Sequence, residues 1–370
     1  MREKTVHRPG EKAGDGALEP SPTNAPAGLR ADSKAPGFPL NGGRVLAIHQ
    51  GALGDFLLTL PLLHGLHHHC AVTFLLRTRE EHGELLRNLL RHLPFVEEVC
   101  AGKETDLTPF YHDTLWEKAP LPPSFQKADA VIFFGQSSAR TVCQRLSRRT
   151  FCPVLWIQSF PREENGAGRV GQFLADQFRS LKIPLENVPV RLQAPDHVFP
   201  ELESRLRSVG IEKDCAPVVL HAGSGGKRKI WPLNQWHGLA TWIGAKTSRK
   251  VVTILGPADS HLVPFARELE KHGVPSLRGL SLVQALALLN RACAYVGNDS
   301  GLSHLAAMAG APSIVIFGPT DPGVWAPEGE NVHIIRTPWD EEHNLNLSPL
   351  PVEVTPHMET IQGLLLPLIS

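Results

Sequence analysis

The 370-residue sequence has no long hydrophobic run and no surplus of either charge. No stretch approaches the roughly 18 to 20 consecutive apolar residues that span a bilayer, and the N-terminus lacks the apolar core of a signal peptide. We therefore expect a cytoplasmic protein. Lys plus Arg and Asp plus Glu both total 37. This balance argues against a nucleic-acid-binding protein, because such proteins usually carry extra cations that neutralise phosphates.

Cysteine chemistry is also sparse. The six cysteines include no CxxC pair. In a reducing compartment, scattered cysteines are more often small buried side chains than disulfides or metal ligands. We therefore predict no metal site built on them.

Proline and glycine are concentrated at the start of the chain. Residues 1–42 contain six of each but only five large apolar side chains, so we expect a disordered N-terminal extension. From residue 43, apolar runs alternate with helical patterns, which predicts parallel sheets with crossover helices. We expect domains over 43–195 and 196–350, joined by a Pro-rich linker at 185–200. A final helix over 351–370 is expected to pack back on the first domain.

The predicted elements fall into two series. Strands are predicted over 45–48, 72–76, 130–134 and 153–157, and then over 218–221, 251–255, 294–297, 313–317 and 332–335. Helices are predicted over 56–69, 81–92 and 137–146, and then over 233–245, 262–272, 282–292 and 300–309.

The loop after the first predicted strand is rich in glycine and ends at Asp55. Its spacing matches neither the dinucleotide fingerprint GxGxxG nor the phosphate loop GxxxxGK[ST]. Asp55 has two interpretations: a carboxylate that caps the next helix, or a base presented to a ligand. The spacing alone favours the cap.

Two segments of the second half have the composition of anion sites. The first, 222–229, combines Gly223, Ser224 and Gly225 with three successive cations; a solvated basic turn is the alternative. The second is the start of the helix predicted at residue 300, where backbone N–H groups can bind an anion. Capping by Asn298, Asp299 and Ser300 explains that segment without a ligand.

A third strand-end loop follows at 317–322. Because these three loops follow strands of one predicted parallel sheet, we expect them to converge on one edge of it. The convergence predicts a nucleotide diphosphate site in the second domain, opposite the Asp55 loop.

Four segments together carry a resemblance to a known family. They are ALGD followed by LTLPLL, then HAGSGGKRKIWP, GNDSGLSHLAAMAG and FGPTDP. In this order and at these distances they resemble glycosyltransferase family 9, the ADP-heptose:lipopolysaccharide heptosyltransferases. The resemblance extends from about residue 44 to the C-terminus. It implies the α/β GT-B fold, with two Rossmann-like domains whose parallel sheets face each other across a cleft.

The resemblance also implies roles for individual residues. It makes Asp55 the catalytic base, overriding the cap, and makes Lys229 the cation before Trp-Pro. The loop has a glycine-rich insertion, so Lys227 is an alternative to Lys229. Acceptor binding is expected in the first domain, where family members often carry Arg or Lys in place of His49 and Ser in place of Gly51. The remaining donor-binding residues are predicted to be Gly223, Ser224, Gly225, Asp299, Ser300, Gly301, Leu302, His304 and Thr320.

The acceptor implied by the family is a lipopolysaccharide core or a similar glycolipid. We expect His49, Gly51, Arg77 and Arg140 to bind it. Further arginines could add contacts to its anionic groups, although a solvated surface helix explains them equally well. These are Arg79, Arg145, Arg148 and Arg149. Peripheral contact with the inner membrane is expected, and no nucleic-acid partner.

The implied reaction is the inverting transfer of a heptose or related sugar from an ADP-sugar. The chain has no Asp-x-Asp pair, the motif by which many sugar transferases hold a metal, so we predict no metal and no cofactor. Two alternatives remain open: a GT-B enzyme acting on another nucleotide sugar, including an epimerase, and a non-catalytic nucleotide-diphosphate-binding protein.

Overall fold

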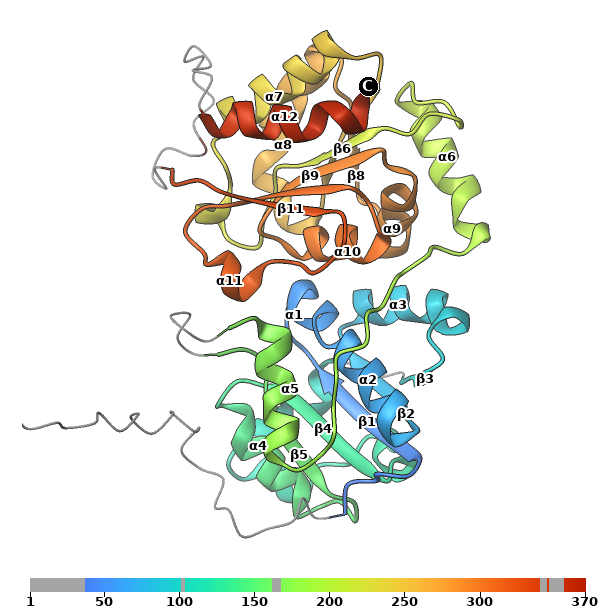
Figure 1. Cartoon of the computed structure of the whole chain (residues 1–370). Coiled ribbons are helices and arrows are strands. Elements are labelled where there is room, and N and C mark those ends of the chain that lie inside the picture. The colour runs from blue at the N-terminus through green and yellow to red at the C-terminus, as the bar shows by residue number, and fades with distance from the viewer. Residues whose placement is uncertain (1–36, 101–103, 162–167, 340–344, 346–355) are drawn as a thin grey trace, which may run out of the picture. The chain divides into compact units, whose positions relative to one another are not determined.

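The structure is a computed structural model that describes residues 37–100, 104–161, 168–339, 345 and 356–370. These residues belong to one compact unit, Ala35–Ser370. Their strands form two sheets in which all neighbouring strands are parallel (Figure 1). The predicted α/β class with two parallel sheets is confirmed.

The first sheet has five strands in the order β3-β2-β1-β4-β5. Its strands are β1 (Gly43–His49), β2 (Val72–Thr78), β3 (Val96–Val99), β4 (Ala130–Gly135) and β5 (Val154–Gln158). Its helices are α1 (Leu53–Leu57), α2 (Leu60–Cys70), α3 (Glu80–Leu89), α4 (Ala139–Ser147) and α5 (Val170–Ser180).

The central strand β1 is buried on both faces. Val45 and Ala47 pack with α2, α3 and α5, whereas Leu46 and Ile48 pack with α4 on the opposite face. Successive side chains of a strand point to opposite faces, so a continuous apolar run suits a strand covered by helices on both sides. This double cover leaves the carboxyl end of β1, and the loop that follows, as the place for polar groups.

The helix predicted over 56–69 is two helices. α1 ends at Leu57 and α2 begins at Leu60. Pro61 explains the break, because proline lacks an N–H group and its ring clashes with the carbonyl four residues earlier. The Thr59 hydroxyl donates a hydrogen bond to the Phe56 carbonyl, 2.7 Å away, at this junction. As a result, Asp55 lies on a short helix of its own.

The second sheet has six strands in the order β11-β10-β9-β6-β7-β8. Its strands are β6 (Val218–His221), β7 (Val251–Leu255), β8 (Ser276–Arg278), β9 (Ala294–Asn298), β10 (Ser313–Phe317) and β11 (Val332–Arg336). Its helices are α6 (Phe199–Ser208), α7 (Leu233–Lys246), α8 (Val263–Lys271), α9 (Leu282–Arg291), α10 (Gly301–Ala309), α11 (Pro322–Trp325) and α12 (Pro356–Ile369).

The connection between the sheets is extended and bonded at two points. The Val188 N–H donates to the Pro61 carbonyl, 3.0 Å away, and the Leu192 N–H donates to the Met308 carbonyl at 2.8 Å. At its far end the connection is shorter than the predicted linker over 185–200, because α6 begins at Phe199. Pro200 occupies the first turn of α6, where proline needs no hydrogen-bond partner.

Two boundary predictions differ from the structure. Phe38, inside the predicted extension 1–42, is buried in the core, so the folded part begins earlier than predicted; residues 1–36 lie outside the described residues. Helix α12 does not pack on the first sheet. It contacts α7, β9 and β10, because its apolar side chains, Met358 and Ile361 among them, join the core of the second sheet.

Candidate active site

The loop after β1 presents Asp55 in the first turn of α1. The Asp55 carboxylate accepts a hydrogen bond from the Ala52 backbone N–H, so the capping interpretation holds. Burial nevertheless raises the pKa of Asp55 to about 6, against the opposing effects of the Lys229 charge and the Ala52 bond, while the Asp299 charge adds to the rise. A carboxyl group with such a pKa also suits general base catalysis near neutral pH. The capping bond and the predicted catalytic role are therefore compatible.

Asp299 is the hydrogen-bonding centre at the edge of the second sheet. Its Oδ2 atom lies 2.8 Å from the Lys229 ammonium and 2.7 Å from the Thr320 hydroxyl, which donates to it. The Ser224 hydroxyl donates to the Asp299 main-chain carbonyl at 2.6 Å. The loops after β6, β9 and β10 therefore meet at Asp299, and the predicted convergence is confirmed. In this structure the side chains of Lys229, Ser224 and Thr320 all bond to Asp299.

Asn298 fixes the path of the loop after β6. Its side-chain amide donates to the Ala222 carbonyl at 2.7 Å, and its Oδ1 atom accepts from the Trp231 N–H at 3.1 Å. Asn298 is fully buried, so these bonds are shielded from water. The next residue but one, Ser300, caps α10 by accepting a hydrogen bond from the Ser303 N–H. The predicted capping role is confirmed for Ser300, whereas the side chains of Asn298 and Asp299 bond to neighbouring loops instead.

A buried His–Asp pair contacts the N-terminal cap of α10. His221 Nε2 lies 3.2 Å from Asp259 Oδ2, and His221 Nδ1 lies 3.3 Å from the Ser300 hydroxyl. Burial opposes ionisation of Asp259. The hydrogen bond from His221, the charge of His221 and the hydrogen bond from the Gly256 N–H nevertheless keep the pKa of Asp259 below its usual range. Sequence reasoning missed His221. A histidine that ends a buried strand at the ligand edge of a parallel sheet was the available signal.

The Gly-rich loop is only partly open. Gly223 is buried, and a Cβ atom there would lie 2.1 Å from Asp259 Oδ1, so this glycine serves close packing. Gly225 and Lys227 are exposed, and Leu302 is half-buried. Donor binding by Gly225, Lys227 and Leu302 stays a prediction, and so does that by Gly223, whose Cα is packed against Asp259.

Helices α1 and α10 meet end to end through glycine. A Cβ atom on Gly301 would lie 2.8 Å from Leu53 Cβ and 3.0 Å from the Gly54 nitrogen, and one on Gly54 would lie 3.1 Å from His304 Cδ2. This contact brings Asp55 within electrostatic range of Lys229 and Asp299. The two predicted catalytic residues, Asp55 in α1 and Lys229 in the loop after β6, are therefore within electrostatic range of each other.

His304 lies at this contact and is buried. Burial lowers its pKa to about 4; the Asp299 charge opposes that shift and the Lys229 charge adds to it. The imidazole is therefore neutral at pH 7. A neutral imidazole can donate one hydrogen bond and accept another.

Two of the predicted acceptor-binding residues adjoin Asp55. The His49 Nδ1 atom lies 3.3 Å from the Gly51 N–H, and a Cβ atom on Gly51 would lie 3.4 Å from Asp55 Oδ2. Burial, reinforced by the charges of His82 and Arg79, lowers the pKa of His49 to about 3. The His49 imidazole is therefore neutral at pH 7.

Several of the predicted arginines have partners within the chain, whereas Arg148 is exposed. Arg77 is buried and forms an ion pair with Asp106, and the Arg140 guanidinium lies over the Trp156 ring, 5.5 Å from its centre. Arg145 donates to the Phe110 carbonyl at 2.9 Å, and Arg149 donates to the Ala119 carbonyl at 3.0 Å. Both side chains bond segments packed against α4, so neither is simply solvated. A glycolipid contact through Arg145 or Arg149 stays a prediction.

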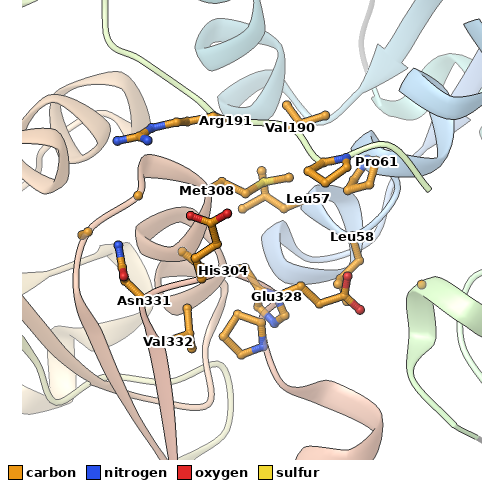
Figure 2. Close-up of a pocket in the computed structure, with 18 of the residues that line it drawn as sticks. Leu57, Leu58, Pro61, Val190, Arg191, His304, Met308, Glu328, Asn331 and Val332 are labelled. Atoms are coloured by element: carbon orange, nitrogen blue, oxygen red, sulfur yellow. The ribbon is translucent and has the colours of Figure 1, made fainter. Parts of the chain in front are cut away.

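A cavity of about 500 Å³ lies beside the contact between α1 and α10. Figure 2 shows Arg191 and Asn331 toward one end of it, Glu328 toward the other, and Leu57 and Met308 between them. Its lining includes His304 but neither Asp55 nor Lys229. His304 therefore lines this cavity and also belongs to the candidate active site.

The described part of the chain shows neither a metal-binding cluster nor a membrane-spanning helix. Among these residues, no group of three or more His, Cys, Asp or Glu side chains is arranged to hold a metal ion. Within the same residues, every helix is too short or too polar to cross a bilayer. All six cysteines are free thiols.

Residues 190–349, less than half of the chain, match Glycosyltransferase family 9 (heptosyltransferase). The chain is 34% identical to lipopolysaccharide heptosyltransferase 1 of Escherichia coli K12 over 131 residues, which is 35% of this chain and 40% of that relative. The match thus spans well under two thirds of the curated relative.

Solved structures share the fold over most of the chain. A glycosyl transferase family 9 structure from Veillonella parvula aligns with a TM-score of 0.66 at 18% identity, covering 90% of this chain and 99% of its own. An E. coli ADP-heptose lipopolysaccharide heptosyltransferase II aligns with a TM-score of 0.64 at 18% identity, covering 88% and 99%. The arrangement of two parallel sheets is therefore that of these glycosyltransferases.

Proposed function

We propose that this chain, whose residues 190–349 match glycosyltransferase family 9, transfers a heptose or related sugar from an ADP-sugar to a lipopolysaccharide core or similar glycolipid. The contact between α1 and α10 carries this proposal. At this contact a carboxyl group of raised pKa is within electrostatic range of Lys229, which bonds Asp299 just before the start of α10. A base and a site for a charged leaving group are what glycosyl transfer to an alcohol requires.

Asp55 acts as the base in this mechanism. Its carboxylate takes the proton of the acceptor hydroxyl as the hydroxyl oxygen attacks the anomeric carbon. The bond from that carbon to the diphosphate oxygen breaks on the opposite face, so one displacement inverts the configuration. General base catalysis of this kind contributes about 10² to 10⁴ in rate.

Lys229 and the start of α10 stabilise the departing ADP. An ammonium group has three N–H donors, so Lys229 can keep its bond to Asp299 and still donate to the diphosphate. The backbone N–H groups at Ser300, Gly301 and Leu302 add donors at the positive end of the helix dipole. Thr320 and Ser224 hold Asp299, and through it they hold the lysine. The residues present therefore supply the charge neutralisation without a metal ion.

The acceptor binds on the side of the first sheet, where His49 and Gly51 adjoin Asp55. Arg77 and Arg140 stay predicted acceptor contacts, although each already has a partner within the chain. We place the enzyme in the cytoplasm, in peripheral contact with the inner membrane that would hold such a glycolipid.

A panel of nucleotide sugars tests this function. We expect ADP-heptose to raise the melting temperature most, and ADP to be released rapidly only when a lipopolysaccharide-core acceptor is present. Release of UDP or GDP would indicate another donor, and conversion of the sugar without an acceptor would indicate an epimerase. Binding of a nucleotide without any turnover would leave a binding protein.

Lys229→Ala tests the leaving-group site by calorimetry. We expect ADP affinity to fall about tenfold or more, because a charge-assisted hydrogen bond is lost. Lys246→Ala is the matched control, since Lys246 is exposed in the last turn of α7, outside the Asp299 cluster. Unchanged affinity in Lys229→Ala would assign the contact to Lys227 or Arg228.

A further inference from the structure

Trp339 connects two loops of the candidate active site. It follows β11 and lies at the same edge of the sheet as the loops after β6 and β10. Its indole N–H donates to the Arg228 main-chain carbonyl, 3.0 Å away, joining residues 111 positions apart. A Cβ atom on Gly318 would lie 2.3 Å from the indole ring, so the ring rests directly on the Gly318 backbone. Only glycine allows that approach.

Arg228 is the middle residue of the 3-10 turn η6 (Lys227–Lys229). Within the turn, the Lys229 N–H donates to the Gly226 carbonyl at 2.9 Å and the Ile230 N–H donates to the Lys227 carbonyl at 3.1 Å. These short-range bonds shape the turn but do not fix its place relative to the sheet. The Trp339 bond acts on the main chain next to Lys229, the residue whose ammonium reaches Asp299.

We propose that Trp339 is a positioning residue: its indole latches the Lys227–Lys229 turn against the Gly318 loop and so holds Lys229 at Asp299. The importance of this latch for catalysis rests on the proposed function, whereas the latch itself does not. Packing alone is the competing explanation, because the indole also packs against the core of the second sheet. The two explanations differ in whether the indole N–H group matters, because packing alone needs only the aromatic ring.

Tryptic cleavage of the unliganded protein separates these explanations, because the turn itself consists of three trypsin sites. Trp339→Phe keeps an aromatic ring but removes the hydrogen-bond donor. We expect cleavage after Lys227, Arg228 and Lys229 to become about fivefold faster, the factor that corresponds to one lost neutral hydrogen bond. Trp242→Phe is the control, since Trp242 lies on α7 and packs against the same core. Trypsin should cleave Trp242→Phe at the same rate as the wild type.

Gly318→Ala tests the latch while keeping Trp339 itself. The added methyl group displaces the ring, so we expect faster cleavage in the same turn, and mass spectrometry locates the cut. Wild-type cleavage rates in both Trp339→Phe and Gly318→Ala would overturn the latch. Faster cleavage in Trp339→Phe only to the extent seen in Trp242→Phe would also overturn it.

ADP titration then connects the latch to the active site. We expect ADP affinity to fall about fivefold in Trp339→Phe, with Trp242→Phe unchanged. If the wild type does not bind ADP, the proposed function fails, and the cleavage rates still decide whether the latch exists. If the wild type binds ADP and trypsin cleaves Trp339→Phe and Gly318→Ala no faster than the wild type, the latch fails and the function stands.

Discussion

Two aspartates lie near the contact between α1 and α10, and their surroundings differ. Asp55, in α1 after the first strand of the first sheet, accepts a backbone hydrogen bond, and burial raises its pKa to about 6. Asp299, on the second sheet, accepts from the Lys229 ammonium and the Thr320 hydroxyl. A carboxylate bonded to a cation serves as a fixed anchor, whereas one destabilised by burial is ready to take a proton. The first loop is suited to proton transfer and the second to holding charge in place.

Asp259 shows that burial alone does not decide this. It is almost fully buried, yet its pKa is lowered, because His221 and the Gly256 N–H stabilise its charge against the effect of burial. The contrast with Asp55 therefore lies in the partners that each carboxylate meets. A variant that removes the charge of one carboxylate should have a different effect from the same change in the other.

Asp55→Asn should have the largest effect. Asparagine keeps the shape and can accept the Ala52 bond, but it cannot take a proton. We expect turnover to fall at least about a hundredfold while ADP affinity is unchanged. Steady-state release of ADP and calorimetry measure the two quantities.

Asp176→Asn provides the matched control for that experiment. Asp176 is an exposed residue of α5 in an ion pair with Arg179, so its replacement should leave turnover unchanged. A nearly fully active Asp55→Asn enzyme would remove Asp55 from the mechanism and reduce it to a capping residue.

Gly54→Ala tests whether the close contact of α1 with α10 matters. The new Cβ atom would lie 3.1 Å from His304 Cδ2 and 3.6 Å from Gly301 Cα, so the helices must separate by a few tenths of an ångström. We expect turnover to fall about tenfold, because small misplacement of reacting groups is costly. Since alanine favours helix more than glycine does, the free energy of unfolding should not fall.

Gly244→Ala is the control for this variant, because a Cβ atom at Gly244 in α7 meets no atom within 4 Å. It should leave turnover unchanged. Equal activity of the two alanine variants would show that catalysis tolerates a looser contact between the helices.

The fold was largely predictable from the sequence. Long apolar runs such as β1 and β10 mark strands covered on both faces, so their positions follow from hydrophobicity alone. Short edge strands carry less signal: β3 contains two glutamates between its valines, and β8 has three residues. The placement of α12 was wrong, because an apolar helix face does not specify which of two apolar surfaces it covers.

The residues of the candidate site and the loops that carry them were predictable from the sequence, but their hydrogen-bond partners were not. Strand ends and glycine loops indicated where Asp55, Lys229 and Asp299 lie. The sequence did not indicate that Lys229, Ser224 and Thr320 all bond to Asp299, or that Arg145 and Arg149 bond main-chain carbonyls. Such pairings depend on three-dimensional neighbours that are distant in the chain. Trp339 was missed for the same reason.

The smallest expected effect concerns stability and its dependence on pH. Because the pKa of Asp55 is raised in the folded state, its favourable contribution is present below the unfolded pKa near 4 and is lost as pH rises through about 6. Asp55→Asn should therefore raise the melting temperature at pH 8 by about 2 °C, allowing for solvent screening, and leave it unchanged at pH 4. Thermal unfolding at the two pH values measures this.

Asp259→Asn should behave in the opposite way. Since the pKa of Asp259 is lowered, its contribution is present above the unfolded pKa and is lost as pH falls through the folded value. Its replacement should lower the melting temperature at pH 8, and the deficit should shrink in acid. If both asparagine variants shifted the melting temperature in the same direction at pH 8, the two carboxylates would not differ in the way their partners imply, and the case for Asp55 as the proton acceptor would lose its electrostatic basis.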